Sequence, residues 1–243
     1  MDRMIYLAMA GAKATMQRQD VLSHNLANAS TNGFRAELAA FRAVPVQGSG
    51  ASTRVYALES TIGHDDSPGP QQTTGRALDV ALQGKAWMAV QALDGTEAYT
   101  RGGALQVDPS GQLVTPAGLP VLGDGGPITV PTDGVPSVLA DGSVLVRTGT
   151  GDLQSVGRIK MATPEAPLKR GDDGLFRAPD GEPLPADETA RLQEGALEGS
   201  NVSPVETLVA MIAAARQFEQ QMKMLQTAQQ NEQGATRLLG TQP

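Results

Sequence analysis

The chain contains no cysteine, few aromatic residues and no long apolar run. Without cysteine among its 243 residues, disulfides, thiolate metal sites and cysteine nucleophiles are excluded. Because aromatic residues make up only 3% of the chain, a globular core must be built from Val, Leu, Ile and Ala. No stretch of about twenty apolar residues is present, so the sequence predicts no membrane-spanning helix.

Basic charge and catalytic motifs are also scarce. With 19 basic and 26 acidic residues the formal net charge is −7, which argues against a nucleic-acid partner because no basic face could neutralise phosphates. There are two histidines, and there is no G-x-S-x-G sequence, P-loop or dinucleotide fingerprint. We therefore expect no enzymatic activity, no cofactor and no small-molecule substrate.

The most informative stretch is the C-terminal run 200–233. Ser203 suits a helix N-cap, Pro204 suits the first helical position, and Glu206 completes a capping box. A helix of roughly thirty residues would be about 45 Å long. Apolar residues recur along it in alternating steps of three and four: Leu208, Met211, Ala215, Phe218, Met222 and Leu225. Such a seam predicts packing against another long helix or within a globular core, and further apolar residues flank its start at Val205, Val209 and Ile212.

A second amphipathic helix is predicted at the N-terminus, from about Met4 to Asn28 and roughly 40 Å long. Its apolar stripe consists of Ile5, Met9, Ala12, Met16, Leu22 and Leu26. The opening residues also resemble a short secretory signal with cleavage near Ala14. Because the stripe continues past that point, we favour a helix that is retained.

Two matched helices at opposite ends of the chain suggest an α+β architecture. The helices would pair antiparallel as a coiled-coil-like core, with a central β domain between them in sequence. From Leu78 onward short strands alternate with Gly turns, and Asp94-Gly95 is a strong hairpin signal. We expect an antiparallel meander or small barrel-like body. The expected division is 1–33 with 200–243 as the helical core, 34–69 as a connector and 70–199 as the body.

Three acidic or histidine-containing clusters are candidate sites. His64-Asp65-Asp66 could ligate a metal, but consecutive residues rarely converge on one ion, so a solvated loop is favoured. Asp172-Asp173 and Asp187-Glu188 lie in Gly- and Pro-rich sequence, where turns or solvated edges are the expected reading. No metal site is therefore predicted. In the connector, residues 35–44 favour either a short helix or an extended arm.

The end of the first helix carries three asparagines that share one helical face, Asn25, Asn28 and Asn32. A buried asparagine can fix the register of packed helices, whereas exposed ones would fray the helix end. Gly33 follows, and Asn-Gly is a turn signal because glycine adopts positive φ readily.

This region resembles the N-terminal signature of the flagellar rod and hook protein family. The matching residues are Asn25, Leu26, Asn28, Thr31, Asn32, Gly33 and Phe34. The family's C-terminal signature is matched from Asn201 and Val202 onward, and residues 78–131 resemble its body domain. The family usually has paired Phe residues where Lys85-Ala86-Trp87 stands here. Within the family, both ends are most similar to the proximal rod proteins, with the distal rod proteins next.

The resemblance implies a structural subunit of the bacterial flagellar basal-body rod, the driveshaft that crosses the periplasm. Such subunits stack helically, with terminal helices inside and β domains outside, and transmit torque without chemistry. The implied partners are other rod subunits, copies of the chain itself and the flagellar type III export apparatus, with no cleaved signal peptide.

Three other readings stay open on the residues alone. One is another flagellar axial protein, of the distal rod or hook type. Another is a coiled-coil adapter that does not polymerise, although such a protein would need strongly charged positions beside its seam. The last is an enzyme acting on a periplasmic polymer through Asp residues of the body, which requires two carboxylates facing one cleft.

Overall fold

The computed structural model describes residues 2–45, 55–131, 134–149 and 152–239. The fold is α+β, with one long helix near each end of the chain and β strands between them. Every strand pair formed by the described residues is antiparallel. The chain forms two compact units: a helical unit of residues 1–29, 35–66 and 202–243, and a β body of residues 30–34 and 67–201.

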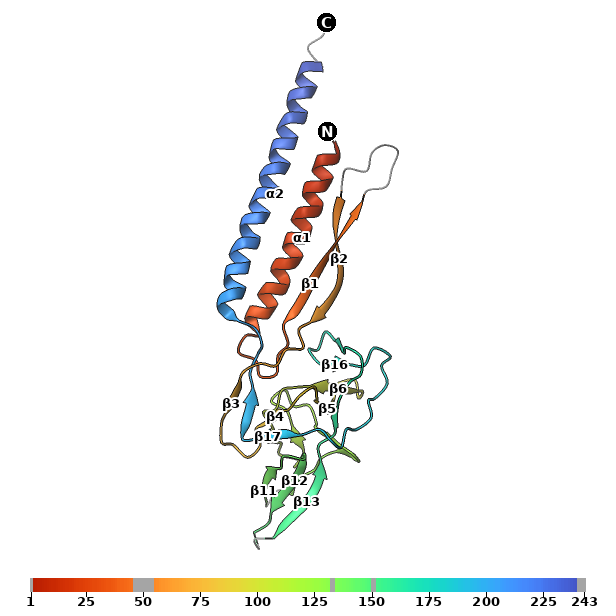
Figure 1. Cartoon of the computed structure of the whole chain (residues 1–243), viewed down its shortest axis with the longest axis vertical. Helices are drawn as coiled ribbons and strands as arrows, with labels where there is room; N and C mark the ends of the chain where they lie inside the picture. The colour runs from red at the N-terminus through yellow and green to blue at the C-terminus, as the bar shows by residue number, and fades with distance from the viewer. Residues whose placement is uncertain (1, 46–54, 132–133, 150–151, 240–243) are drawn as a thin grey trace. The chain divides into compact units, whose positions relative to one another are not determined.

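In the helical unit, α1 (Asp2–Ala27) and α2 (Pro204–Leu239) lie side by side and run in opposite directions (Figure 1). The 36 residues of α2 correspond to a rod about 54 Å long. The helix begins at Pro204, and the backbone N–H of Glu206 donates to Ser203 Oγ over 3.4 Å. The predicted N-cap is therefore confirmed, because this contact satisfies one of the free N–H groups of the first turn.

A two-stranded hairpin, β1 (Glu37–Pro45) and β2 (Val55–His64), lies against α1 on the side away from α2 (Figure 1). The sequence left this part of the connector as a short helix or an extended arm, and it is extended and paired. Local propensity could not identify the pairing, because the partner of each strand lies across residues 46–54, which are outside the described residues.

The β body consists of several small sheets. The largest has five strands in the order β14 (Met161–Ala162), β5 (Trp87–Gln91), β6 (Glu97–Thr100), β16 (Phe176–Arg177) and β15 (Lys169–Arg170). A second has three, in the order β11 (Val135–Val138), β12 (Ser143–Arg147) and β13 (Leu153–Arg158). The other pairs are β17 (Leu192–Glu194) with β4 (Val80–Leu82), β18 (Ala196–Glu198) with β3 (Gln71–Thr73), β7 (Gln106–Val107) with β8 (Leu113–Val114), and β9 (Leu122–Gly123) with β10 (Gly126–Pro127).

The predicted hairpin at Asp94-Gly95 is confirmed by its turn chemistry. Gly95 has φ +82°, and Asp94 Oδ1 accepts hydrogen bonds from the N–H and the hydroxyl of Thr96. The turn joins β5 to β6, whose side chains lie at the centre of the body. The main core is aliphatic, as the composition required, and its fully buried members include Leu82, Met88, Leu105, Leu113 and Ile159. In the part of the chain that the structure describes, no helix is both long and apolar enough to cross a membrane.

Candidate assembly surface and the junction of the terminal motifs

The buried residues of the two helices are small, and the helices approach each other closely. Ala8, Ala12 and Thr15 are buried on α1, at steps of four and three. On α2 the most covered positions also follow steps of four and three: Thr207, Met211, Ala214, Phe218, Gln221, Leu225 and Ala228. A Cβ added at Gly11 would lie 3.0 Å from the Gln221 side chain, so the helices approach closely there. Interhelical distance depends on the side chains at the contact, and close approach favours small ones.

The predicted apolar seams coincide with this face only in part. On α1, Ala12 is buried and Ile5, Leu22 and Leu26 are half-buried, whereas Met9 and Met16 are 54% and 53% exposed. On α2, Met211, Ala215, Phe218 and Leu225 are half-buried, whereas Leu208 and Met222 are exposed. Half of the predicted α2 positions are therefore displaced by one residue: Thr207, Ala214 and Gln221 are more covered than the predicted Leu208, Ala215 and Met222.

The consequence is an apolar surface on the outside of the helical unit. Near the start of α2, Val205, Leu208, Val209 and Ile212 are 71%, 48%, 63% and 56% exposed. On α1, Tyr6 is exposed together with Met9 and Met16. The two groups lie towards opposite ends of the antiparallel helix pair, because Gly11 of α1 lies against Gln221 of α2. We call the seven residues together the outer apolar surface. Single exposed apolar residues are common, but contiguous groups on one helix are typical of interaction sites.

Asn25 is buried and attaches the hairpin to α1. Its Nδ2 donates to the Glu37 carbonyl over 2.9 Å, and its Oδ1 accepts from the Glu37 N–H over 2.8 Å. The Glu37 carboxylate lies 3.0 Å from His24 Nδ1. Asn28 instead closes the helix end, where its Nδ2 donates to the His24 carbonyl over 3.0 Å. Asn25 therefore fixes the packing of α1, as a buried asparagine can, but its partner is a strand and not a second helix.

The two terminal family motifs meet within the β body. The N–H of Gly33 donates to the Glu198 carbonyl over 2.8 Å, and the N–H of Asn201 donates to the Phe34 carbonyl over 3.3 Å. Asn201 Nδ2 also donates to the Ser67 carbonyl over 3.0 Å. These bonds join segments from opposite ends of the sequence.

Gly33 is required at this junction for two reasons. Its φ is +71°, and an added Cβ would lie 2.3 Å from the Arg101 carbonyl carbon, so any side chain would displace the backbone. The next residue, Phe34, is buried with its ring 4.4 Å below the Arg170 guanidinium carbon. Of the remaining motif residues, Thr31 and Asn32 are exposed and Val202 is buried.

Beneath the junction lies a buried ion pair between Arg101 and Glu198, whose side chains are 2% and 1% exposed. Arg101 Nη2 and Nε are 2.7 and 2.8 Å from Glu198 Oε2. The guanidinium also donates to the carbonyls of Leu82, Gly84 and Ala86. The guanidinium thus makes four hydrogen bonds and a further charge contact from Nη2 to the carboxylate. Sequence reasoning missed both residues, because a pairing across 97 positions leaves no local pattern.

The candidate polar sites are structural. His64 ends β2 with its side chain 6% exposed and Nε2 2.9 Å from Asp66 Oδ1, so the expectation of a solvated loop is wrong for this residue. A hydrogen bond from Arg177 lowers the pKa of Asp173 from its usual value. Hydrogen bonds from Thr163 and Thr189 lower the pKa of Asp187 to about 2. Among the described residues, no group of three His, Asp or Glu side chains could hold a metal ion.

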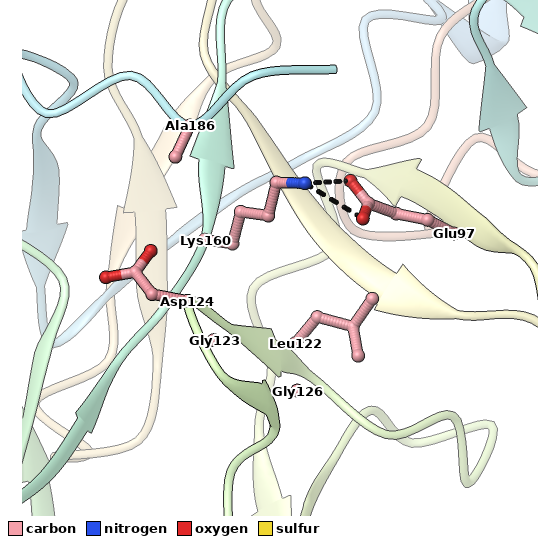
Figure 2. Close-up of a pocket in the computed structure, with 7 residues that line it drawn as sticks. All are labelled: Glu97, Leu122, Gly123, Asp124, Gly126, Lys160 and Ala186. Atoms are coloured by element: carbon pink, nitrogen blue, oxygen red, sulfur yellow. Dashed lines mark hydrogen bonds and ion pairs between the residues drawn. The ribbon is translucent and has the colours of Figure 1, made fainter. Parts of the chain in front are cut away.

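The β body contains a pocket of about 420 Å³ lined by Glu97, Leu122, Gly123, Asp124, Gly126, Lys160 and Ala186 (Figure 2). Lys160 Nζ lies 2.7 Å from Glu97 Oε1, and the Tyr99 hydroxyl donates to the same carboxylate over 2.6 Å. Burial, followed by this contact, raises the pKa of Tyr99. Glu97 and Lys160 thus bind each other in the pocket wall, while Asp124 points away from them (Figure 2).

Three family models match the chain in chain order. They are the flagella basal body rod protein model at residues 5–35, the flagellar hook protein FlgE/F/G D1 domain at 81–146, and the C-terminal model of the flagellar basal body rod FlgEFG proteins at 193–238. The flagellar basal-body rod protein FlgF of Salmonella typhimurium is 49% identical, over 98% of this chain and 99% of its own length. The chain belongs to the flagellar basal-body rod protein family.

Other rod proteins are similar over nearly their whole length. FlgF of Escherichia coli is 47% identical over 98% of this chain and 99% of that protein. FlgG of Bacillus subtilis is 32% identical over 94% of this chain and 96% of that protein. The chain is therefore a FlgF-like structural rod protein and not an enzyme, as the resemblance of its terminal motifs implied.

The matched regions correspond to particular structural elements. The first covers most of α1 and extends through the Gly33–Phe34 junction. The last contains β18, Asn201 and nearly all of α2. The two terminal family regions thus each contribute a helix to the helical unit and a short segment to the β body.

Proposed function

We propose that this rod protein polymerises through its two terminal helices, and that the resulting tube transmits torque from the motor to the hook. The observation that supports the proposal is the outer apolar surface, which the chain's own helix pairing leaves exposed. The predicted seam residues would then have two roles. Those on the inner face hold α1 to α2, and those on the outer face contact neighbouring subunits.

Covering the outer apolar surface with a neighbouring subunit is favourable. Removing a fully exposed large apolar side chain from water contributes roughly 1.5–3 kcal/mol, so covering several in each subunit offsets much of an association cost of roughly 4–15 kcal/mol. The alternating steps of three and four along both helices suit a coiled-coil-like arrangement. Contacts between different surfaces of identical or related subunits generate helical filaments when the rotation does not close.

The proposed partners are copies of this chain, other rod subunits and the flagellar type III export apparatus. The proposed location is the rod as it crosses the periplasm, reached without cleavage of a signal peptide. The family relationship supports these assignments, and the absence of cysteine is compatible with them. A distal rod or hook-type role is the second candidate, because FlgG of Bacillus subtilis is similar over most of the chain.

Ile212→Asp tests the proposal, because Ile212 is exposed on α2 and its replacement adds charge only to the outer apolar surface. We expect the purified variant to keep the parent's circular dichroism and melting temperature. Cells carrying it in place of the parent should not swim, and their basal bodies should have incomplete rods by electron microscopy. Gln217→Asp adds the same charge at an exposed polar position of the same helix and should support swimming.

Complete rods in the Ile212→Asp strain would show that the outer apolar surface is not an assembly contact. Complete rods in a strain lacking the chain would contradict the rod role itself, and a non-polymerising adapter would then be favoured. The two strains therefore distinguish a wrong assignment of the assembly surface from a wrong assignment of the rod function.

A further inference from the structure

We propose that Glu198 is a folding latch, whose docking onto Arg101 gates the folding of the whole β body. Its Oε2 accepts a hydrogen bond from Arg101 Nε–H over 2.8 Å and lies 2.7 Å from Nη2, and its Oε1 accepts from the N–H of Gly69 over 3.0 Å. Its backbone carbonyl receives the N–H of Gly33. One residue near the end of the body thus closes contacts to segments 97, 129 and 165 positions earlier in the chain (198 − 101, 198 − 69 and 198 − 33).

The charges explain why these contacts form together. Arg101 cannot be buried at low cost before Glu198 arrives, because a desolvated guanidinium without a counter-ion is strongly unfavourable. Glu198 cannot be buried alone for the same reason. The carbonyls of Leu82, Gly84 and Ala86 hold the arginine in place, but they do not neutralise its charge.

The glycines near the ion pair leave no room for a partly docked arrangement of Glu198. Backbone segments pack closely beside the residues of the ion pair: a Cβ at Gly69 would lie 2.1 Å from the Gly199 carbonyl oxygen, and one at Gly33 would lie 2.3 Å from the Arg101 carbonyl carbon. The last strand, β18, therefore has to pack closely against these backbone segments when the Glu198 carboxylate docks. Body sheets that form earlier should remain unstable until residues 198–201 are in place.

The latch has a consequence that rests on the proposed function. The flagellar resemblance implies export of the unfolded chain, and a body that cannot close until a residue near its end has docked would suit such export. The folding experiment below does not involve export, so its outcome is independent of the rod assignment.

Trp87 supplies the readout, because it is the only tryptophan, is buried in β5, and has its ring 5.9 Å from the Arg101 guanidinium carbon. Stopped-flow fluorescence of the full chain after dilution from urea therefore follows closure at the latch itself. The test variant is Glu198→Gln. Its amide must place an N–H₂ group against either Arg101 or the Gly69 N–H, so one donor faces another.

We expect Glu198→Gln to slow refolding about ten-fold or more and to change the unfolding rate much less, as for a contact formed in the transition state. Glu194→Gln, which removes the same charge from an exposed position on β17, should fold and unfold as the parent does. Parent-like refolding with faster unfolding would overturn the proposal, because the pair would then form after the rate-limiting step.

Glu198→Asp covers the case in which Glu198→Gln does not fold. It keeps the charge but shortens the side chain, so refolding should again be slowed more than unfolding is accelerated. If Glu198→Asp refolds at the parental rate, the latch is excluded.

Discussion

The helical unit and the β body bury their side chains in opposite ways. The body encloses a continuous aliphatic core in which Leu105, Leu113 and Met88 are completely buried. In the helical unit the buried residues of the helices are alanines and small polar residues, the larger Met211 and Phe218 are half-buried, and Val209, Ile212 and other large apolar side chains stay in solvent. The body therefore buries its own apolar side chains, whereas the helices expose apolar side chains that a neighbouring subunit can cover.

The buried polar side chains also differ between the helical unit and the β body. In the body, all three guanidinium nitrogens of Arg101 and both carboxylate oxygens of Glu198 have partners. In the helical unit, the buried amide of Asn25 engages the backbone of one strand residue, Glu37. The body therefore depends on contacts between distant segments, and the helical unit on contacts between whole elements.

The largest effect is expected from a cavity in the body core. Leu113→Ala removes a fully buried side chain and should lower the free energy of unfolding by about 2–5 kcal/mol. Urea titration followed by Trp87 fluorescence measures this loss. Leu153→Ala truncates an exposed leucine of the same body and should cost far less. Equal losses in the two variants would contradict the self-contained core.

A smaller and local effect is expected in the helical unit. Asn25→Ala leaves the N–H and carbonyl of Glu37 without their side-chain partners, at a cost of about 1–3 kcal/mol. Hydrogen exchange should accelerate at the Glu37 amide and leave the core strands of the body protected. Asn28→Ala, at a half-buried position, is the matched control and should leave the Glu37 amide protected. Faster exchange throughout β5 and β6 would show that the two units unfold together.

The smallest effect is expected from acid. Because the pKa of folded Asp187 lies at about 2, below its ordinary value of 3.8, its ionised form favours folding. That contribution is complete above about pH 4 and is lost as the pH falls through about 2. Asp187→Asn should therefore flatten the dependence of melting temperature on pH in this window. Asp124→Asn removes an exposed carboxylate of the same body and should keep the parental slope. An Asp187→Asn slope as steep as the parent's would assign the acid response to other carboxylates.

Local sequence signals determined the elements that depend on near neighbours. The start of α2 was predicted from Ser203 and Pro204, and the β5–β6 turn from Asp94 and Gly95, because capping and turn chemistry act within four residues. The two long helices followed from periodicity, and the aliphatic core from the scarcity of aromatic residues. The family resemblance at both ends then pointed to a structural rod protein.

Tertiary structure decided which surfaces and charges meet. Close helix approach covers Ala8 and Ala214 and leaves Met9 exposed, although an apolar pattern alone ranks methionine as the better seam residue. The pairing of Arg101 with Glu198 likewise depends on how the chain returns through the body, since the two charges lie 97 positions apart. Sequence by itself specified the two long helices and the β5–β6 hairpin, because those choices depend on adjacent residues, but it left the connector strand β1 undecided. The inner helix face and the buried ion pair depend on distant segments, which only the folded chain brings together.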